Sequence, residues 1–464
     1  MNPSKFSLNN IHFVGIGGSG MSGIAEVLFN LGYKVSGSDK LESDTTKRLR
    51  DMGIEIYYEH SASNLEKVEM VVLSSAITET NPEVIEAKSR FIPILARAEM
   101  LSSLMNTKRG IAIAGTHGKT STTSMVASIM TEAGLDPTFI NGGIINSFNS
   151  NAQLGKGKYL IAEADESDQS FLLLQPSMSI ITNIEPDHLV NYDYSFENLK
   201  IAFLNFVKKL PFNGMAIVCG DDPTIRELIP KFSRSYITYG FNENNDYVLY
   251  DYSSKGFHSS FKLRTESEDF SLSFNMLGRH NVLNAAAAAV LCIQEGISIE
   301  VINHSLKHFM GISRRMEVLG ELSINRSSCI LVDDYGHHPT EIKSTIDSIR
   351  ESFPNKKLHM VFQPHRYTRT KDLFTEFAEV LSEVDRLILL NVYSAGEEVI
   401  KGINSDELMK KIIDLNFNKV EILNDVTEII KSLESKIDKD SVLIMQGAGD
   451  ISDISTEIRK KYLD

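Results

Sequence analysis

The sequence predicts three domains of α/β character, and two observations lead to that prediction. First, its 464 residues exceed the roughly 250–300 that one hydrophobic core usually serves. Second, short β-rich runs alternate with helical runs in three successive stretches, which is typical of parallel sheets with crossover helices. We expect the domains to comprise residues 1–108, 109–312 and 313–464.

The first stretch has the pattern of a Rossmann-like domain. Residues 11–14 are apolar enough for a buried strand, residues 21–31 have the pattern of a helix, and residues 34–36 predict a second strand. Two further strand-like runs, at 70–73 and 92–95, continue the alternation. A parallel sheet is therefore expected within the first hundred residues.

The second and third stretches repeat this rhythm, with an interruption between them. The second opens with an apolar strand at 111–114, and further strands are expected at 159–162 and 179–182. Residues 234–276 are polar, with Asn, Asp and Ser turns, which predicts a small antiparallel β insert. The third stretch begins after about Gly311, and its strands are expected at 329–332, 359–362, 386–390 and 442–445.

Composition and charge exclude several classes of function. The chain is 42% hydrophobic and 23% charged, as in ordinary globular proteins, and its net charge of −14 argues against nucleic acid as a partner. Its three cysteines, Cys219, Cys292 and Cys329, are too far apart for a CxxC metal site and too few for a disulfide framework. We therefore expect reduced core thiols.

No segment of the sequence predicts export or membrane insertion. Residues 1–10 contain one lysine and no apolar run, so no secretory signal is visible. The alanine-rich run at 285–293 is far shorter than the ~20 apolar residues of a membrane span. We expect a cytoplasmic protein without membrane contact, either a monomer or a homodimer.

The sharpest local signal is a glycine-rich turn between the strand at 111–114 and a helix at 121–133. Its backbone N–H groups can surround a phosphate at the positive end of the helix, while a lysine adds charge and a threonine hydroxyl can bind Mg²⁺. The general P-loop pattern has a glycine where this sequence has Ile113, so the loop is shortened. We expect a P-loop ATPase-like central domain that binds ATP through Gly115, Thr116, His117, Gly118, Lys119 and Thr120.

A second glycine-rich turn lies between the first strand and the first helix. Asp39 follows it at the end of the next strand, a spacing that suits a diphosphate on the helix N-terminus and an acid on a ribose hydroxyl. A dinucleotide oxidoreductase would show the same pattern, but a second phosphate site at residue 115 argues against a simple dehydrogenase. The residues expected to bind this second nucleotide are Gly15, Gly17, Gly18, Ser19, Gly20 and Asp39.

Two acidic loops follow strands downstream of the P-loop. Glu163 begins one loop, and the run 183–188, which ends at His188, forms the other. Acidic loops are usually solvated, but two of them at strand ends after a P-loop favour Mg²⁺, which prefers oxygen ligands. We expect a magnesium site there.

These motifs together resemble the Mur ligase family of peptidoglycan synthesis. The resemblance covers essentially the whole chain. It implies an N-terminal domain for a UDP-sugar, a central domain for ATP, and a Rossmann-like C-terminal domain for the incoming amino acid. The segments that carry it are 15–23, 115–120, Glu163, 183–188, 278–281, 314–315, 333–339 and 363–369.

The resemblance also implies roles for individual residues around ATP. Lys119 would neutralise the β- and γ-phosphates, with Thr120 and Glu163 on one Mg²⁺ and His188 on a second. Arg315 and Asp334, from the C-terminal domain, would complete the ATP site on domain closure. The residues expected near the adenine are Asn281 and Asn284.

Four residues of the C-terminal domain are expected to hold the other substrates. Tyr335, His337, Arg366 and Arg369 would position the amino acid and a sugar-linked carboxylate, since a planar arginine fork suits a carboxylate. Without the resemblance, the two arginines could instead line a solvated helix start. His337 and its neighbour His338 cannot easily point into one site.

The resemblance implies an ATP-dependent ligase with UDP-N-acetylmuramate and L-alanine as substrates. The γ-phosphoryl group of ATP would pass to a carboxylate, and the amine would attack the resulting acyl phosphate. His188, His337 or water could remove the amine proton. Three alternatives stay open: a family member that attaches a preformed tripeptide, a regulatory protein without turnover, and an oxidoreductase for residues 1–108 alone.

Overall fold

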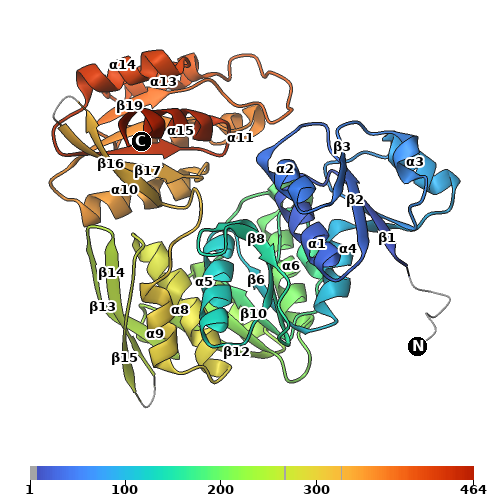
Figure 1. Cartoon of the computed structure of the whole chain (residues 1–464). Helices are drawn as coiled ribbons and strands as arrows, with labels where there is room; N and C mark the ends of the chain where they lie inside the picture. The colour runs from blue at the N-terminus through green and yellow to red at the C-terminus, as the bar shows by residue number, and fades with distance from the viewer. Residues whose placement is uncertain (1–7, 266–267, 325–326, 464) are drawn as a thin grey trace. The chain divides into compact units, whose positions relative to one another are not determined.

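The computed structural model describes residues 8–265, 268–324 and 327–463, with the side chain of Ser19 left aside. The described strands form three sheets, of five, ten and six strands (Figure 1). The chain divides into two compact units, each described by itself. The first comprises Met1–Tyr250, Lys262–Leu272 and Leu283–Phe309, and the second comprises Asp251–Phe261, Ser273–Val282 and Met310–Asp464. The expectation of α/β domains is confirmed.

The five-stranded sheet is parallel throughout, with the order β3-β2-β1-β4-β5. Its central strands carry continuous buried apolar residues, such as Phe13 in β1 and Val72 in β4, which is typical of strands covered on both faces. Helix α1 begins at Ser19, two residues before the predicted start, because the end of the glycine-rich turn is already helical. The elements are β1 (Asn10–Val14), α1 (Ser19–Asn30), β2 (Lys34–Ser38), α2 (Asp44–Asp51), β3 (Glu55–Tyr57), β4 (Met70–Leu73), α3 (Pro82–Ser89), β5 (Ile94–Ala96) and α4 (Arg97–Met105).

The ten-stranded sheet has the order β15-β14-β13-β12-β11-β10-β6-β9-β7-β8. Strands β6 and β9 to β12 pair in parallel, and β8 pairs antiparallel with β7 at one edge. The P-loop therefore lies at the end of a central strand. The elements are β6 (Arg109–Ala114), α5 (Lys119–Glu132), β7 (Thr138–Ile145), β8 (Ser150–Gln153), β9 (Tyr159–Glu163), β10 (Met178–Ile181), α6 (Phe196–Lys208), β11 (Met215–Cys219), α7 (Pro223–Leu228), β12 (Ser235–Gly240), α8 (Arg279–Gln294) and α9 (Ile299–Lys307).

The predicted β insert begins later than expected. Strand β12 pairs in parallel with β11, so its residues belong to the main sheet rather than to the insert. The insert is formed by β13 (Tyr247–Lys255), β14 (His258–Arg264) and β15 (Asp269–Phe274). Only two residues separate β13 from its sheet neighbour β14, and such a short connection requires an antiparallel pair.

The six-stranded sheet has the order β16-β17-β21-β18-β19-β20, with only the edge strand β16 antiparallel to its neighbour. Helices cover both faces: Ile342 of α10 and Phe377 of α12 lie in one core, and Ile429 of α14 and Ile458 of α15 lie in the other. The elements are β16 (Glu317–Ile324), β17 (Ser327–Asp334), α10 (Pro339–Ser352), β18 (Lys357–Phe362), α11 (Tyr367–Asp372), α12 (Phe374–Leu381), β19 (Arg386–Leu389), α13 (Ser405–Asp414), β20 (Val420–Ile422), α14 (Val426–Lys436), β21 (Ser441–Gln446) and α15 (Ile451–Tyr462).

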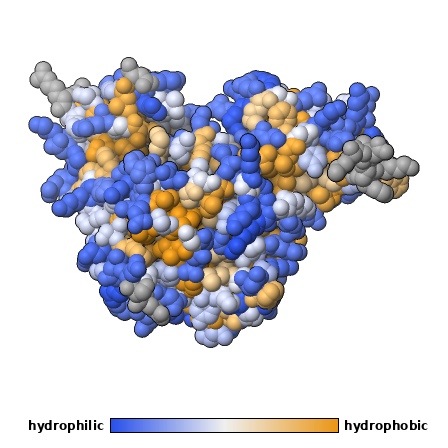
Figure 2. All heavy atoms as spheres, turned by 60° about the horizontal axis from the view of Figure 1, so that its bottom comes forward, coloured by the Kyte–Doolittle hydropathy of each residue, from blue (hydrophilic) through white to orange (hydrophobic). Residues whose placement is uncertain are grey.

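Apolar side chains that reach the surface form islands among hydrophilic ones on the face shown in Figure 2. Among the helices that the structure describes, none combines the length and apolar character needed to cross a bilayer. The alanine-rich run of α8 is instead packed inside the protein, with Ala285 to Cys292 fully buried. The three cysteines are buried and free, as predicted.

Candidate functional site

The P-loop follows β6 and needs glycine at two positions. Gly115 has a φ of +137° and Gly118 a φ of +86°, a region of backbone conformation that favours glycine. A side chain at Gly115 would overlap the hydroxyl of Thr182, and one at Gly118 would overlap the carboxamide of Asn284. Both glycines therefore allow strand β10 and helix α8 to pack directly against the loop.

Lys119, the first residue of α5, is held inside the P-loop. Its ammonium donates to the carbonyl oxygens of Gly115 at 2.6 Å and Thr116 at 3.1 Å, and to both oxygens of Glu166 at 3.0 and 2.8 Å. Burial disfavours the charge, but the carboxylates of Glu166 and Asp165 outweigh it and raise the pKa of Lys119. The lysine is thus protonated and ready to neutralise phosphate oxygens.

Glu166 is a site residue that the sequence motifs did not identify. Burial raises the pKa of its carboxyl to about 7 in spite of Lys119, and the hydroxyl of Tyr192 donates to its backbone carbonyl. For Asp165, burial is outweighed by Lys119, Ser167 and Arg97, so the pKa falls below its usual range. The loop after β9 therefore places two carboxyl groups beside the P-loop lysine, and Asp165 is the one whose ionised form is favoured.

The second acidic loop, after β10, is joined to the P-loop by hydrogen bonds. The Asn183 carboxamide accepts from the N–H of His117 at 2.8 Å and donates to the His117 carbonyl at 3.0 Å. The N–H of Glu185 donates to the Thr116 hydroxyl at 2.9 Å. The structure thus brings residues 115–120 and 183–185 together.

The oxygen donors near the P-loop fit Mg²⁺. Glu163 ends β9, and its Oε1 is buried without a hydrogen-bond partner among the described residues. Thr120 is largely buried in the first turn of α5, and Glu163 is close enough to raise the pKa of Lys119. Mg²⁺ typically uses one or two protein oxygens and completes its coordination with phosphates and water. Thr120 and Glu163 would hold it, and the ion would supply charge neutralisation of the transferring phosphoryl group.

His188 and the two asparagines stay predictions as ligand contacts. His188 has a φ of +55°, which a non-glycine residue rarely adopts, and its Nε2 lies 3.4 Å from Oδ2 of Asp187. Asn281 donates to the Leu277 carbonyl at 2.8 Å within the second unit. Asn284 lies against Gly118 in the first unit.

The N-terminal glycine-rich loop is braced by Asp39. Its Oδ2 accepts a hydrogen bond from the N–H of Gly17 at 2.9 Å, and its Oδ1 accepts from the N–H of Leu41 at 3.3 Å. Asp39 therefore shapes the loop itself, whereas its contact with a ribose stays a prediction. Gly20 needs to be small because a side chain there would meet the guanidinium of Arg97.

Arg97 is a further residue that motif reasoning missed. It begins α4, and its guanidinium lies 3.6 Å from Asp165, 3.9 Å from Asp168 and 3.3 Å from the Ser170 hydroxyl. It is thus placed between the N-terminal glycine-rich loop and the acidic loop that carries Glu166. Arg97 lies at the start of a helix and outside any recognised motif, so the sequence alone did not indicate it.

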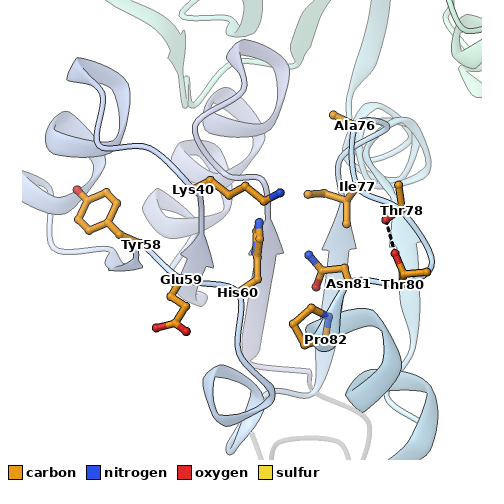
Figure 3. A pocket seen from close by; sticks show the side chains of 10 residues that line it. All are labelled: Lys40, Tyr58, Glu59, His60, Ala76, Ile77, Thr78, Thr80, Asn81 and Pro82. Atoms are coloured by element: carbon orange, nitrogen blue, oxygen red, sulfur yellow. Dashed lines mark hydrogen bonds between the residues drawn. The ribbon is translucent and has the colours of Figure 1, made fainter. Parts of the chain in front are cut away.

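A cavity of about 480 Å³ opens beside the N-terminal loop (Figure 3). It lies outside the carboxyl ends of β2, β3 and β4, which is where open α/β sheets bind ligands. Figure 3 shows the side chains of Lys40 and His60 facing those of Ile77 and Asn81. The lining residues are Lys40, Tyr58, Glu59, His60, Ala76, Ile77, Thr78, Thr80, Asn81 and Pro82.

In the second unit, Asp334 anchors the turn that follows β17. Its Oδ1 accepts from the N–H of Met316 at 2.9 Å, and its Oδ2 accepts from the Thr345 hydroxyl at 3.0 Å and from Gln446 Nε2 at 2.7 Å. The adjacent Asp333 is buried, which raises the pKa of its carboxyl to about 6 although Arg314 opposes this. Asp334 is structurally engaged, and its role toward ATP stays a prediction.

An aromatic and basic cluster lies after β17 and β18. The ring of His337 is 5.5 Å from Tyr335 and 5.7 Å from His365, and His365 stacks on Tyr393 at 5.5 Å. Burial lowers the pKa values of His337 and His365 to about 4, so both rings are neutral near pH 7. The sequence analysis missed His365, because only the two arginines of the segment 363–369 were predicted to bind substrate.

Of the arginines predicted as site residues, two contact this cluster and one is exposed. Arg369 Nη1 is 3.3 Å from Nδ1 of His365, and Arg315 lies over the Tyr335 ring at 5.0 Å. Arg366 is exposed and has a φ of +72°. His338 points elsewhere and caps α10 by accepting from the N–H of Thr340 at 3.3 Å. The cluster thus combines neutral rings with cations that suit a carboxylate.

The P-loop with its partly buried lysine, the second glycine-rich loop with a cavity beside it, and the separate basic cluster fit an ATP-dependent enzyme with a second nucleotide as substrate. Comparison with known families agrees. The Mur ligase family catalytic domain matches residues 10–109, the Mur ligase middle domain matches residues 113–292, and the glutamate ligase domain of Mur ligases matches residues 314–449.

Solved structures of Mur ligases share the fold of this chain. The UDP-N-acetylmuramate-alanine ligase MurC from Thermotoga maritima is 29% identical with a TM-score of 0.84, over 98% of this chain and 99% of that one. The murein peptide ligase from Psychrobacter arcticus is 23% identical with a TM-score of 0.72, over 98% of each chain. The MurF ligase from Thermotoga maritima, solved with ADP, is 15% identical with a TM-score of 0.63, over 92% and 95%.

The chain belongs to the Mur ligase family. It is an ATP-dependent, amide-forming ligase of peptidoglycan synthesis, and its central domain is the one that binds ATP.

Proposed function

We propose that this ligase joins L-alanine to the lactyl carboxylate of UDP-N-acetylmuramate, with ATP converted to ADP and phosphate. The observation that carries the proposal is the full-length match, at 29% identity, to an enzyme whose name states that activity. The neutral histidines and the arginine beside them in the second unit add support, because they suit a small amino acid with a free carboxylate.

The reaction proceeds in two steps. An oxygen of the lactyl carboxylate attacks the γ-phosphorus of ATP, and the bond to the β-phosphate oxygen breaks to release ADP. Lys119 neutralises charge on the transferring group, where fixed cations are worth most. The neutral amine of alanine then attacks the acyl carbon, phosphate leaves with the bonding pair, and one proton is lost from nitrogen.

The proposal assigns roles to residues of both units. Thr120 and Glu163 would hold Mg²⁺, and His188 would hold a second ion. Arg315 and Asp334 join the ATP site when the domains close, since such closure sequesters a reactive acyl phosphate from water. Tyr335, His337, Arg366 and Arg369 position alanine. The substrates are cytoplasmic precursors, so we expect the enzyme in the cytoplasm.

The test measures phosphate release from ATP and Mg²⁺ with UDP-N-acetylmuramate, adding L-alanine, a tripeptide or no amine. We expect release that depends on alanine and a product heavier by one alanyl residue in mass spectrometry. Release only with the tripeptide would reassign the chain to the ligase that attaches a preformed peptide. Release with neither amine would refute this assignment.

A further inference from the structure

A buried group of polar residues lies directly behind the cavity of the five-stranded sheet. At its centre is Glu83 in the first turn of α3, whose side chain has no exposed surface. Asn64 Nδ2 donates to Oε1 of Glu83 at 2.7 Å, and His12 Nε2 lies 3.3 Å from the same oxygen. The Ser38 hydroxyl donates to Oε2 at 2.6 Å.

His60 is the member of this group that reaches the cavity. Its Nδ1 is 2.8 Å from Oε2 of Glu83 and 2.9 Å from the Ser38 hydroxyl, and only 7% of its side chain is exposed. Its Nε2 has no hydrogen-bond partner among residues 8–265, 268–324 and 327–463. Figure 3 shows the ring between Lys40 and Asn81 at the cavity wall.

The hydrogen bonds determine which ring nitrogen carries a proton. Burial would raise the pKa of Glu83, but hydrogen bonds from His12, Ser38 and Asn64 outweigh it and lower the pKa to about 2. An ionised carboxylate only accepts hydrogen bonds, so Nδ1 of His60 must be the donor. In a neutral ring, Nε2 is then an acceptor that faces the cavity.

The cavity suits the nucleoside part of the second substrate. The loops after β2, β3 and β4 form it, and these strands lie around β1, which carries the glycine-rich loop. Ile77, a lining residue, lies 3.5 Å from where a side chain at Gly15 would be. A diphosphate on the glycine-rich loop therefore leaves its nucleoside beside His60, and the cavity volume is within the usual range for such ligands.

We propose that Glu83, held by His12, Ser38 and Asn64, is a positioning residue that orients His60, so that Nε2 of His60 contacts the nucleoside of the nucleotide-sugar substrate. The proposal rests on the proposed function, in which that substrate is a UDP-sugar. An acceptor at Nε2 takes a hydrogen bond from an N–H or O–H group. In uridine these are the imide N–H of the base and the ribose hydroxyls, whereas cytosine has no N–H at the imide position.

The test measures the affinity of the full chain for UDP by titration calorimetry. We expect His60→Ala to weaken UDP binding about 3- to 10-fold, the range for loss of one hydrogen bond, and His60→Gln to retain more affinity because an amide can replace both bonds. Glu83→Gln should weaken binding to a similar extent. The double variant Glu83→Gln, His60→Ala should bind no more weakly than His60→Ala, because Glu83 acts through His60.

Kinetic and structural controls separate positioning from folding. The KM for the UDP-sugar should rise while kcat and the affinity for ATP stay unchanged. His359→Gln is the matched control, because His359 is a buried histidine that pairs with Asp438 at 3.1 Å in the second unit. If Glu83→Gln does not fold, Asn64→Ala loosens the same carboxylate with a smaller change.

CDP binding adds a test of what Nε2 contacts. If His60 contacts the base, wild type should prefer UDP to CDP and His60→Ala should lose that preference; if it contacts the ribose, His60→Ala should weaken both equally. Unchanged UDP affinity in His60→Ala, an equal loss in His359→Gln, or additive losses in the double variant would overturn the proposal. Wild type that binds ATP but not UDP would instead refute the proposed function.

Discussion

The two glycine-rich loops of the first unit share one local design, a strand, a tight turn and a helix, but they differ in what surrounds them. The P-loop is enclosed by the loops that follow β9 and β10, with Lys119 bound by Glu166 and His117 bound by Asn183. The N-terminal loop is braced by Asp39, but the cavity beside it is lined by residues from the loops after three different strands, β2, β3 and β4. Six consecutive residues are enough to form a phosphate site, so it can be recognised in the sequence. A nucleoside site is formed by loops at the ends of several strands, which are not adjacent in the sequence.

The largest expected effect is at the P-loop lysine. Lys119→Ala should reduce phosphate release at least ~10³-fold, because a fixed cation on the transferring phosphoryl group is lost. The matched control is Lys108→Ala, since Lys108 also donates to two backbone carbonyls, those of Gly155 and Gly157, each at 2.7 Å. Equal activity losses in both variants would mean that Lys119 acts only through folding.

The glycines that precede the two helices should respond differently. Gly118→Ala should weaken ATP binding at least ~10-fold, because its φ of +86° strains a side chain and Asn284 occupies the space. Gly18 has a φ of −61°, and its nearest neighbour would be 3.6 Å away. Gly18→Ala should change the free energy of unfolding by less than about 0.5 kcal/mol. Thermal melts and ATP titrations check both, and equal tolerance would contradict the comparison.

Protonation of Glu83 at low pH should lower the stability of the folded protein. Its folded pKa of about 2 lies below the reference value of 4.5, so the unfolded state binds more protons between these values. Stability from this group is therefore present above about pH 4.5 and is lost as pH falls toward 2, by at most about 3 kcal/mol. Melting temperatures between pH 3 and 6 should fall less in Glu83→Gln than in wild type. Parallel curves would contradict this.

The effect on stability expected at Asp39 is smaller than that at Glu83. Asp39→Ala removes the hydrogen bond from the N–H of Gly17 and should lower stability by about 1 kcal/mol. UDP affinity should fall while ATP affinity stays unchanged, because the P-loop has its own supports. A change in ATP affinity of similar size would show that the two loops are coupled.

Strand positions followed closely from the sequence, because buried parallel strands are continuous apolar runs. Residues 70–73 and 111–114 lie in β4 and β6 as predicted. The insert was placed too early because β12 is polar in part, and its parallel pairing with β11 depends on a neighbour distant in sequence. Short strands such as β3 carry too few residues to show a pattern.

The sequence by itself determined the family, the α/β class, and the residues of both glycine-rich turns, because each depends on a few adjacent residues. Only the tertiary structure identified Glu166 as the partner of Lys119, Arg97 beside Gly20, and Glu83 behind His60. These residues lie between 23 and 77 positions from their partners. The sheet brings the ends of its strands to one edge, and so it places residues that are distant in sequence next to each other. A local sequence pattern contains no information about such pairs.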